Sequence, residues 1–554
     1  MLREMINMNV ERNLKLLDEL LEFRQTNGEK VKFKLVKLRI TKYNSMLKNL
    51  LENCENIDVS LAQLTRMEIP DKFYPKITSV SYGLWDGQQS FFSAGAYVSK
   101  LNNIQELNIL SATDIALDPE EDKSDISLLK LVLLNKSKLK KCIAELDISQ
   151  ARSKLPAFIS ILPPGISEFD VIIRQATNMR EKVAMLRYDS VKYLEFDIPD
   201  ADGEDRELDF NFVCGFPNVE VMKIRLSKPA KSLLYGNIRN YSLKKLSLSR
   251  QSFVRFNIHN FVALKQLFIK QCVFKEVVDF MDSFPTVVEE LHLDSCDFNT
   301  DQVSFHLPDS IEKLLLAFLP LEANFNLNEM ANLRELAYVS YSIENVPLSC
   351  KSLETLILSN RNPLEVPELP LDLSRGIYLK KLVVDCSYEI SPILFPPSLT
   401  FLELYNPTIT SSTDCSSLDT VRYFSLSDAG HIDGEFQIRS IPKHIKNFRF
   451  HGRYETIMQH LDLLPPNEKM DRIKIEIDMP QLIGMQDLTS LLQLKSRVFG
   501  TPVDNEKLNE DLSGVNMFCF TSSNARLMVA RTEYPLYSNE CIWNMMPTVE
   551  EWFL

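Results

Sequence analysis

One apolar pattern occurs three times in the stretch from Tyr241 to Phe298: YSLKKLSLSRQSF (241–253), ALKQLFIKQCVF (263–274) and VVEELHLDSCDF (287–298). In each copy an apolar residue is followed by two more, three and five positions later. The triplets are Leu243/Leu246/Leu248, Leu264/Leu267/Ile269 and Val288/Leu291/Leu293. The second and third residues of each triplet are two positions apart and share one face of an extended chain. Each copy therefore predicts a short strand with one buried face.

Two further positions of the pattern recur. In the second and third copies a cysteine lies eight positions after the first apolar residue, and a phenylalanine follows two positions later: Cys272 with Phe274, and Cys296 with Phe298. With these residues the stretch resembles the leucine-rich-repeat pattern L-x-x-L-x-L-x-x-N/C-x-L. The chain of such a repeat turns inward after its strand. A small side chain at the cysteine position is therefore expected to be buried at the bend.

The triplet recurs along most of the chain. From residue 243 to residue 445 successive triplets begin 20 to 26 residues apart, a spacing typical of leucine-rich repeats. The series ends with Met470/Ile473/Ile475. Weaker matches precede residue 243 and include Leu35/Leu38/Ile40, Leu128/Leu131/Leu133 and Ile143/Leu146/Ile148. Since each repeat packs only on its neighbours, the length of 554 residues is compatible with one solenoid.

The predicted fold class is α/β, a leucine-rich-repeat solenoid with a curved parallel sheet and mostly short turns on its convex side. Residues 31–478 form the solenoid. Residues 1–30 are predicted as an N-terminal helical cap, because apolar residues recur at helical spacing in 9–25. Residues 479–554 are predicted as a helical and aromatic C-terminal cap, with an amphipathic helix at 481–499. Caps are expected because a solenoid has two open ends.

Composition narrows the classes of function. Sixty-two basic and 75 acidic residues give a net charge of −13, so nucleic acid is not expected as the main partner. The ten cysteines are scattered singly, and the N-terminal residues carry charges where a signal peptide needs an apolar core. No apolar run is long enough to cross a membrane. We expect a reduced protein of the cytoplasm, the nucleus or both, with solvated acidic loops at 118–125 and 197–209.

Motifs for catalysis and cofactor binding are missing from the sequence. It has no GxxxxGK[ST], GxSxG, HExxH or GxGxxG. His444 and His451 are the one histidine pair with a suggestive spacing, and they are expected to be separate surface residues. The sequence therefore predicts no enzyme, no cofactor and no metal site.

A binding surface is expected on the concave face, where residues two, four and six positions into each repeat point away from the core. From residue 311 to residue 405 these positions are unusually apolar, and exposed apolar patches mark interaction sites. The predicted partner-binding residues are Leu315, Val339, Ile357, Val383, Phe401 and Tyr405. Two alternatives stay open: a register slip of one residue would exchange the faces, and the C-terminal segment would cover the patch if it folded back.

A second surface is basic. Repeats that begin at 219, 243 and 264 place a strip of cationic side chains at the same positions: Lys223, Arg225, Lys245 and Lys270. The strip would meet an acidic partner protein, face solvent, or contact phosphate.

The repeats of residues 31–475 also resemble irregular, asparagine-poor repeats of fungal and protist intracellular proteins, of which Phe395 to Leu404 (FPPSLTFLEL) is an example. Some of those proteins contain an F-box and hold substrates for ubiquitin ligation. This chain lacks the Leu-Pro-x-Glu type helix that begins an F-box. The leading prediction is a protein–protein interaction scaffold. The alternative is the substrate-recognition subunit of an SCF-type ubiquitin ligase, with a ligase adaptor as partner.

Overall fold

The computed structural model describes the residues that form the repeats and leaves the intervening segments undescribed. The described residues are 5–8, 33–38, 45–60, 64, 69–83, 100–110, 138–147, 165–174, 189–198, 207–209, 216–234, 241–274, 284–298, 303–319, 323–340, 352–360, 373–386, 394–405, 415, 418–427, 440–460, 465, 470–479, 494, 498, 517–521 and 525–531. The chain divides into two compact units, Met1–Val303 (unit 1) and Ser304–Leu554 (unit 2).

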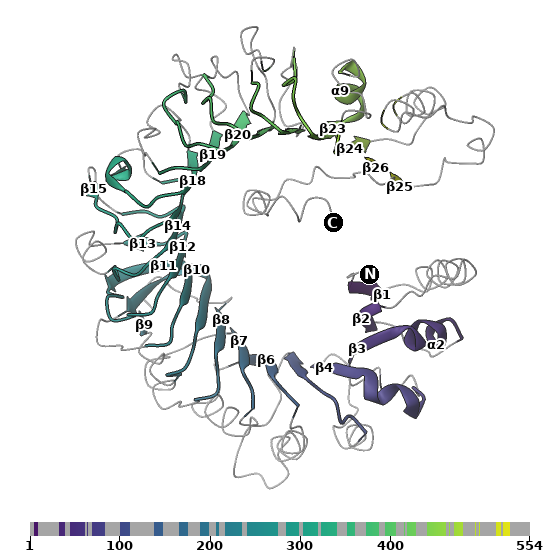
Figure 1. Ribbon diagram of the computed structural model, residues 1–554. Helices are drawn as coiled ribbons and strands as arrows, with labels where there is room; N and C mark the ends of the chain where they lie inside the picture. Colours follow the sequence, from purple (N-terminus) through teal and green to yellow (C-terminus); the bar gives the residue numbers. More distant parts are fainter. Residues whose placement is uncertain are drawn as a thin grey trace, which may run out of the picture. The chain divides into compact units, whose positions relative to one another are not determined.

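Unit 1 is a parallel sheet in which successive strands are neighbours (Figure 1). Its strands are β1 (Met5–Met8), β2 (Phe33–Leu38), β3 (Cys54–Ser60), β4 (Ile77–Gly83), β5 (Glu106–Leu110), β6 (Lys141–Asp147), β7 (Glu168–Arg174), β8 (Tyr193–Ile198), β10 (Val221–Leu234), β11 (Lys245–Phe256), β12 (Gln266–Lys270) and β14 (Glu290–Asp294). Short strands β9 (Glu207–Asp209) and β13 (Val273–Phe274) pair with the later residues of β10 and β11.

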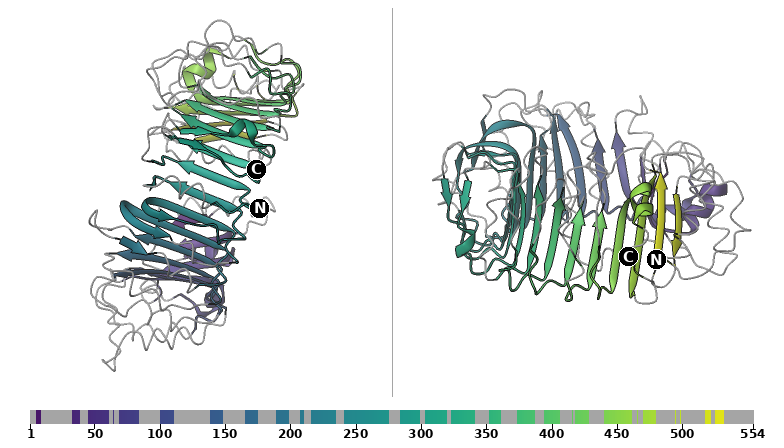
Figure 2. Two further views of the ribbon diagram at one scale, coloured as in Figure 1. Left: turned by 90° about the vertical axis from the view of Figure 1, so that its left-hand side faces the viewer. Right: turned by 90° about the horizontal axis from the view of Figure 1, so that it is seen from above.

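Unit 2 repeats the arrangement, and both views of Figure 2 show its strands running in one direction. Its parallel strands are β16 (Lys313–Ala317), β18 (Glu335–Ser340), β19 (Thr355–Asn360), β20 (Lys381–Cys386), β21 (Phe401–Tyr405), β22 (Tyr423–Ser427), β23 (Asn447–Arg453), β24 (Arg472–Met479) and β26 (Ala525–Arg531). Strand β25 (Met517–Thr521) is antiparallel to β26. A separate pair is formed by β15 (Val303–Phe305) and β17 (Ala323–Phe325).

The described connections contain few helical residues. They include two α-helices, α2 (Ser45–Glu52) and α9 (Tyr454–Gln459), two 3₁₀ helices, Asp71–Lys76 and Leu327–Glu329, and single helical positions such as Leu64 and Cys415. The prediction of short turns on the side away from the strands is consistent with these connections. Within the described residues, no helix is long and apolar enough to cross a membrane.

The apolar triplets line the core. Leu246, Leu267 and Leu291 lie opposite one another on β11, β12 and β14, and each is at most 2 % exposed. In unit 2 the equivalent residues are equally buried, among them Leu336 and Phe424. A period of two along each strand and a fixed register between strands produce this continuous apolar layer.

The bend after the strand has the predicted construction. Arg250, Gln271, Ser295 and Phe318, each seven positions into its repeat, have φ between 51° and 57°. This left-handed turn redirects the chain inward. The thiols of Cys272 and Cys296, one position later, are buried, and they donate to the carbonyl oxygens of Lys270 and Asp294 at 3.3 and 3.5 Å.

Gln251 and the phenylalanines complete this side of the core. Gln251 has no exposed surface and takes the place of the cysteine in its own repeat, with its amide nitrogen 3.4 Å from the oxygen of Ile224. The rings of Phe253, Phe274 and Phe298 stack from one repeat to the next, with centroids 5.3 and 5.5 Å apart. The stack extends the contact between repeats beyond the strands.

Three N-terminal matches were assigned wrongly. Cys142 lies opposite the buried Leu107 and Phe169, so this repeat begins at the buried Leu139 and the predicted triplet Ile143/Leu146/Ile148 starts four residues too late. Val36 lies opposite Ile57, which contradicts Leu35/Leu38/Ile40. Strand β5 pairs directly with β6, so Leu128/Leu131/Leu133 supplies no strand between them. Apolar triplets occur often by chance, and several apolar residues on one strand face allow more than one starting position for the repeat.

The sheet also extends into both predicted caps. Strand β1 lies within residues 1–30, and β25 and β26 lie within 479–554. The predicted helix at 9–25 lies outside the described residues, as does most of the helix at 481–499. Leu494 and Val498 of the second helix are helical and buried. The acidic segment 118–125 is outside the described residues, whereas β8 and β9 contribute the first and last residues of 197–209.

Candidate functional site

The strand positions that point away from the core define a second face in each unit. On unit 2 its central row runs Leu315, Ala337, Ile357, Val383 and then, over the last strands, Glu403, Ser425, Arg449 and Lys474. The row therefore has an apolar half on β16 to β20 and a polar half on β21 to β24. The register slip considered for this region does not occur, because the core rows are occupied by the predicted triplets.

The apolar half is buried. Leu315, Val339, Ile357 and Val383 are 0 to 2 % exposed and form one cluster with Ala317 and Ala337. The prediction that these four residues form an exposed patch is therefore wrong. Within the described residues, Phe318, Phe401 and Tyr405 pack against this cluster.

Phe401 and Tyr405 are the two predicted residues that keep accessible surface. Both are half-buried and pack against the apolar cluster from β21. The partner-binding role of the six predicted residues stays a prediction.

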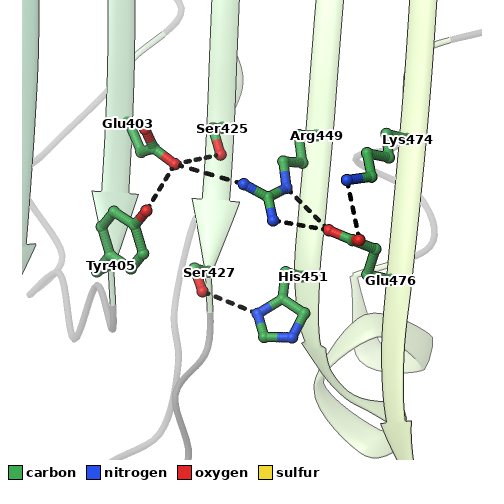
Figure 3. Close-up of polar contacts among 8 residues, drawn as sticks. All are labelled: Glu403, Tyr405, Ser425, Ser427, Arg449, His451, Lys474 and Glu476. Carbon is green, nitrogen blue, oxygen red and sulfur yellow. Dashed lines mark hydrogen bonds and ion pairs between the residues drawn. The ribbon is translucent and has the colours of Figure 1, made fainter. Parts of the chain in front are cut away.

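The polar half contains a network of buried and half-buried side chains (Figure 3). We define the polar cluster as Glu403, Tyr405, Ser425, Arg449, Lys474 and Glu476. Its members come from four adjacent strands, and the parallel register places Glu403, Ser425, Arg449 and Lys474 directly opposite one another. The fold therefore presets the positions of these groups.

Glu403 is the most buried member, with 2 % of its surface exposed. The hydroxyls of Tyr405 and Ser425 donate to its Oε1 at 2.9 and 3.0 Å, and Arg449 Nη1 lies 4.0 Å from the same oxygen. Burial raises the pKa of Glu403, and this effect outweighs the cation and the two hydroxyls. Burial and the Glu403 carboxylate together raise the pKa of Tyr405 as well.

Arg449 makes its close contacts with the other carboxylate. Its Nε and Nη2 donate to Glu476 Oε2 at 2.9 and 2.7 Å, and Lys474 Nζ lies 2.9 Å from Glu476 Oε1. Burial favours a higher pKa for Glu476, but the charges of Arg449 and Lys474 outweigh it and lower the pKa. The two carboxylates thus differ in their partners. Glu476 is kept charged by Arg449 and Lys474, whereas Glu403 is near Arg449 alone, at 4.0 Å, within this cluster.

Two further features adjoin the cluster. Ser427 Oγ and His451 Nδ1 are 3.2 Å apart on one side of it (Figure 3). On the other side the rings of Phe401 and Tyr423 stack with centroids 4.0 Å apart and planes 4° from parallel, and Lys381 Nζ lies 4.9 Å from the Phe401 centroid. We refer to Phe401 and Tyr423 as the aromatic shelf.

Sequence reasoning missed the polar cluster although its signal was present. The positions four and six into the repeats that begin at 399, 421, 445 and 470 are occupied by Glu403, Tyr405, Ser425, Ser427, Arg449, His451, Lys474 and Glu476. Opposite charges in neighbouring repeats at one position would have indicated a network.

The predicted basic strip is largely neutralised. Glu195 lies on the strand next to Lys223 and Arg225, and its oxygens are 3.5 Å from Lys223 Nζ and 2.6 Å from Arg225 Nη2. Lys270 Nζ lies 3.1 Å from Asp294 Oδ2. The parallel register thus places a carboxylate beside each of these three residues, and the role of the basic strip stays a prediction. Lys245 instead lies 4.2 Å from the Phe268 centroid.

Unit 1 also carries a carboxyl group that the prediction did not include. Asp170 Oδ2 lies 3.8 Å from Lys141 Nζ, while its buried Oδ1 has no hydrogen-bond partner. Burial raises the pKa of Asp170 to about 6, and Glu195 and Glu168 add to this effect against the charge of Lys141. Within the described residues, no group of His, Cys, Asp and Glu side chains is arranged to hold a metal ion.

Comparison with known proteins yields structural similarity alone. No protein-family model matches the chain, and no curated protein matches it by sequence. The TLR13–ssRNA13 complex aligns over 80 % of this chain and 78 % of its own, with 14 % identity and a TM-score of 0.42. CroV588, described as a novel circular LRR protein structure, aligns over 91 % and 77 %, with 12 % identity and a TM-score of 0.35.

A third solved structure, the mouse RP105/MD-1 complex, aligns over 89 % of this chain and 84 % of its own, with 11 % identity and a TM-score of 0.34. At these levels the likeness concerns the fold. The chain's own features identify its class: steady repeats, in-register parallel strands and buried cysteines after left-handed turns. The protein folds as a solenoid of leucine-rich repeats.

Proposed function

We propose that the chain is a non-enzymatic interaction scaffold that binds a protein partner on the second face of unit 2, over β20 to β24. The observation that carries the proposal is the combination of half-exposed aromatic side chains with fixed charges. Phe401 and Tyr405 are half-buried beside the polar cluster, and Arg449 is held by two hydrogen bonds. Aromatic and arginine side chains that are already ordered lose little entropy on binding and often dominate interfaces.

The burial of the apolar cluster changes which predicted residues would contact a partner. Ile357 and Val383 would support the surface from below. Phe401 and Tyr405 would make the contacts, together with Arg449 and His451. This placement moves the proposed centre of the interface from the middle of residues 315–405 to its C-terminal end.

Site-specific photocrosslinking tests the proposal in cells of the source organism. The full chain would carry p-benzoylphenylalanine at position 401 or 405, and at position 241 as a matched aromatic control. Tyr241 is 64 % exposed, in unit 1, so it offers a more accessible position that lies outside the proposed surface. We expect one protein to be crosslinked from 401 and 405 and not from 241.

Two results would count against the proposed scaffold. Equal crosslinking from position 241 would show that the product is not specific to this face. A specific product from position 241 with none from positions 401 and 405 would place the binding surface elsewhere. Mass spectrometry of the product also examines the alternative function. Crosslinking of a ligase adaptor from either unit would support the alternative function, the substrate-recognition subunit of a ubiquitin ligase. No described residue favours that alternative.

A further inference from the structure

Lys381 has an unusual place on the second face of unit 2. It is half-buried on β20, next to Phe401 on β21. Its ammonium group lies 4.9 Å from the centroid of Phe401, whose ring stacks in turn on Tyr423 of β22. The aromatic shelf thus holds the ammonium group by a cation–π contact.

The charge of Lys381 is incompletely matched. Burial lowers the pKa of Lys381, against the more distant carboxylates Glu403 and Glu335. Glu403 already accepts hydrogen bonds from Tyr405 and Ser425, and Glu335 is 3.0 Å from Lys313. In the part of the chain that the structure describes, no acceptor lies within hydrogen-bond or ion-pair distance of Lys381 Nζ.

Three other lysines on the second faces lie within ion-pair distance of a carboxylate. Lys223 and Lys313 are 3.5 and 3.0 Å from Glu195 and Glu335 of a neighbouring strand, and Lys474 is 2.9 Å from Glu476 of its own strand. Lys245 resembles Lys381 in contacting an aromatic ring, that of Phe268. A half-buried ammonium group has three donors, and leaving them without acceptors away from bulk water is unfavourable. Lys381 therefore differs from the three ion-paired lysines in having donors available for a ligand.

We propose that Lys381 receives a carboxylate from an acidic side chain of the partner polypeptide, with an adjacent apolar side chain of the partner against the aromatic shelf. The proposal rests on the proposed function, because it names the chemistry of the partner at the same face. The ammonium group selects an anionic acceptor. The apolar shelf beside it selects a polypeptide segment that combines Asp or Glu with an apolar residue rather than a free inorganic anion.

The energetics favour such a contact. A charge-assisted hydrogen bond in a partly desolvated site is stronger than one on an open surface. The cation–π contact fixes the Lys381 side chain beforehand, so less rotamer entropy is lost on binding. The nearby Glu403 does not oppose an incoming carboxylate strongly, since its own charge is shared with Arg449 and burial raises its pKa.

Peptide selection on the full chain tests the proposal. A phage-displayed library of random linear peptides would be selected on the wild-type protein, and the enriched peptides synthesised with Glu or Asp and with Gln or Asn in their place. Affinity would be measured for wild type, Lys381→Met and the control Lys380→Met. Lys380→Met removes the same charge at the adjacent residue. Lys380 does not belong to this face, and its Nζ lies 2.7 Å from Glu354 Oε2.

The expected result is enrichment of acidic residues next to apolar ones. Lys381→Met should weaken the acidic peptides roughly 10- to 100-fold, the range of a hydrogen bond to a charged group, and should leave the amide peptides unchanged. Lys380→Met should bind both sets like wild type. Lys381→Arg, which keeps the charge, provides a second variant if Lys381→Met fails to fold by circular dichroism, and it should retain the preference for acidic peptides.

Selection without acidic enrichment would overturn the proposal, as would acidic peptides that bind Lys381→Met as tightly as wild type. A third variant separates this failure from failure of the proposed function. If Phe401→Ser abolishes binding while Lys381→Met does not, the face binds polypeptide and the role of Lys381 is wrong. If neither substitution alters binding of any selected peptide, both the role of Lys381 and the face are wrong.

Discussion

Arg449 donates both Nε and Nη2 to a single oxygen of Glu476, at 2.9 and 2.7 Å, from a neighbouring parallel strand. The third nitrogen of its guanidinium, Nη1, is left at 4.0 Å from Glu403. Both carboxylates are at least nine-tenths buried, so Arg449 compensates two buried anions unequally, and Lys474 gives Glu476 a second cation. Such clusters add little net stability compared with apolar residues, yet they are sensitive to the loss of one partner.

Arg449→Met is therefore expected to destabilise unit 2 by about 3–5 kcal/mol, because it removes the cation nearest to the buried Glu403 and leaves Glu476 with Lys474 alone. The measurement is the free energy of unfolding by urea, followed by tryptophan fluorescence and circular dichroism. The triple variant Arg449→Met/Glu403→Gln/Glu476→Gln should recover at least half of the loss, since both carboxylate charges are removed. A single variant as stable as wild type would show that the cluster is solvated in solution.

The burial of the apolar cluster predicts that truncating one of its residues lowers stability more than truncating an exposed residue. Ile357→Ala should cost about 2–5 kcal/mol of unfolding free energy, the range for truncating a buried isoleucine. The matched control is Ile377→Ala, because Ile377 is 60 % exposed and an exposed truncation is usually within about 0.5 kcal/mol of wild type. Equal effects of the two substitutions would contradict the burial of Ile357 and restore the exposed patch that the sequence pattern indicated.

The repeats were predictable because their cause is local. Leu246, Leu267 and Leu291 each lie in a triplet that one repeat contains entirely, and parallel stacking then brings the three together. The inward turn before Cys272 is local in the same sense. Where apolar residues continue along the same strand face, as Leu146 follows Cys142, the local pattern cannot decide where the repeat begins, and pairing with β5 and β7 resolves the register.

The surface was less predictable because its properties depend on neighbouring repeats. Lys223 appears as a free cation along the sequence, and it is neutralised by Glu195, 28 positions earlier. The burial of Val383 likewise depends on side chains in the repeats on either side. Comparing equivalent second-face positions in successive repeats would have predicted both the Glu195 contact and the polar cluster.

Asp170 provides a prediction about pH. Its pKa is raised in the folded protein to about 6, whereas an unfolded aspartate titrates near 3.9. The folded state therefore binds the proton more tightly than the unfolded state. The stability that Asp170 contributes is present below the unfolded pKa and is lost as the pH rises through the folded pKa of about 6. Asp170→Asn should stabilise the protein more at pH 8 than at pH 5, with no gain near pH 3.5, as measured by the midpoint of thermal unfolding.

The control for Asp170 is an exposed aspartate. Asp309→Asn, at an exposed position, should show no such growth of stability with pH. If the Asp170→Asn advantage is the same at every pH, then the substitution acts through the amide's hydrogen bonds, and the ionisation of Asp170 contributes nothing.

The buried cysteines yield the last prediction. Burial raises the pKa of Cys54 to about 11 and that of Cys272 to about 12, so neither thiol forms the reactive thiolate at neutral pH. In native protein at pH 8, iodoacetamide should modify Cys54, Cys142, Cys272, Cys296 and Cys415 far more slowly than it modifies them in urea, as measured by mass spectrometry of each peptide. Within the described residues, Cys54, Cys142, Cys272 and Cys296 form no disulfide bond. A chain from a reducing compartment should give ten titratable thiols when it is denatured without reductant. Rapid native labelling of Cys272 would show that the bend opens in solution, while fewer than ten thiols would contradict a reducing location.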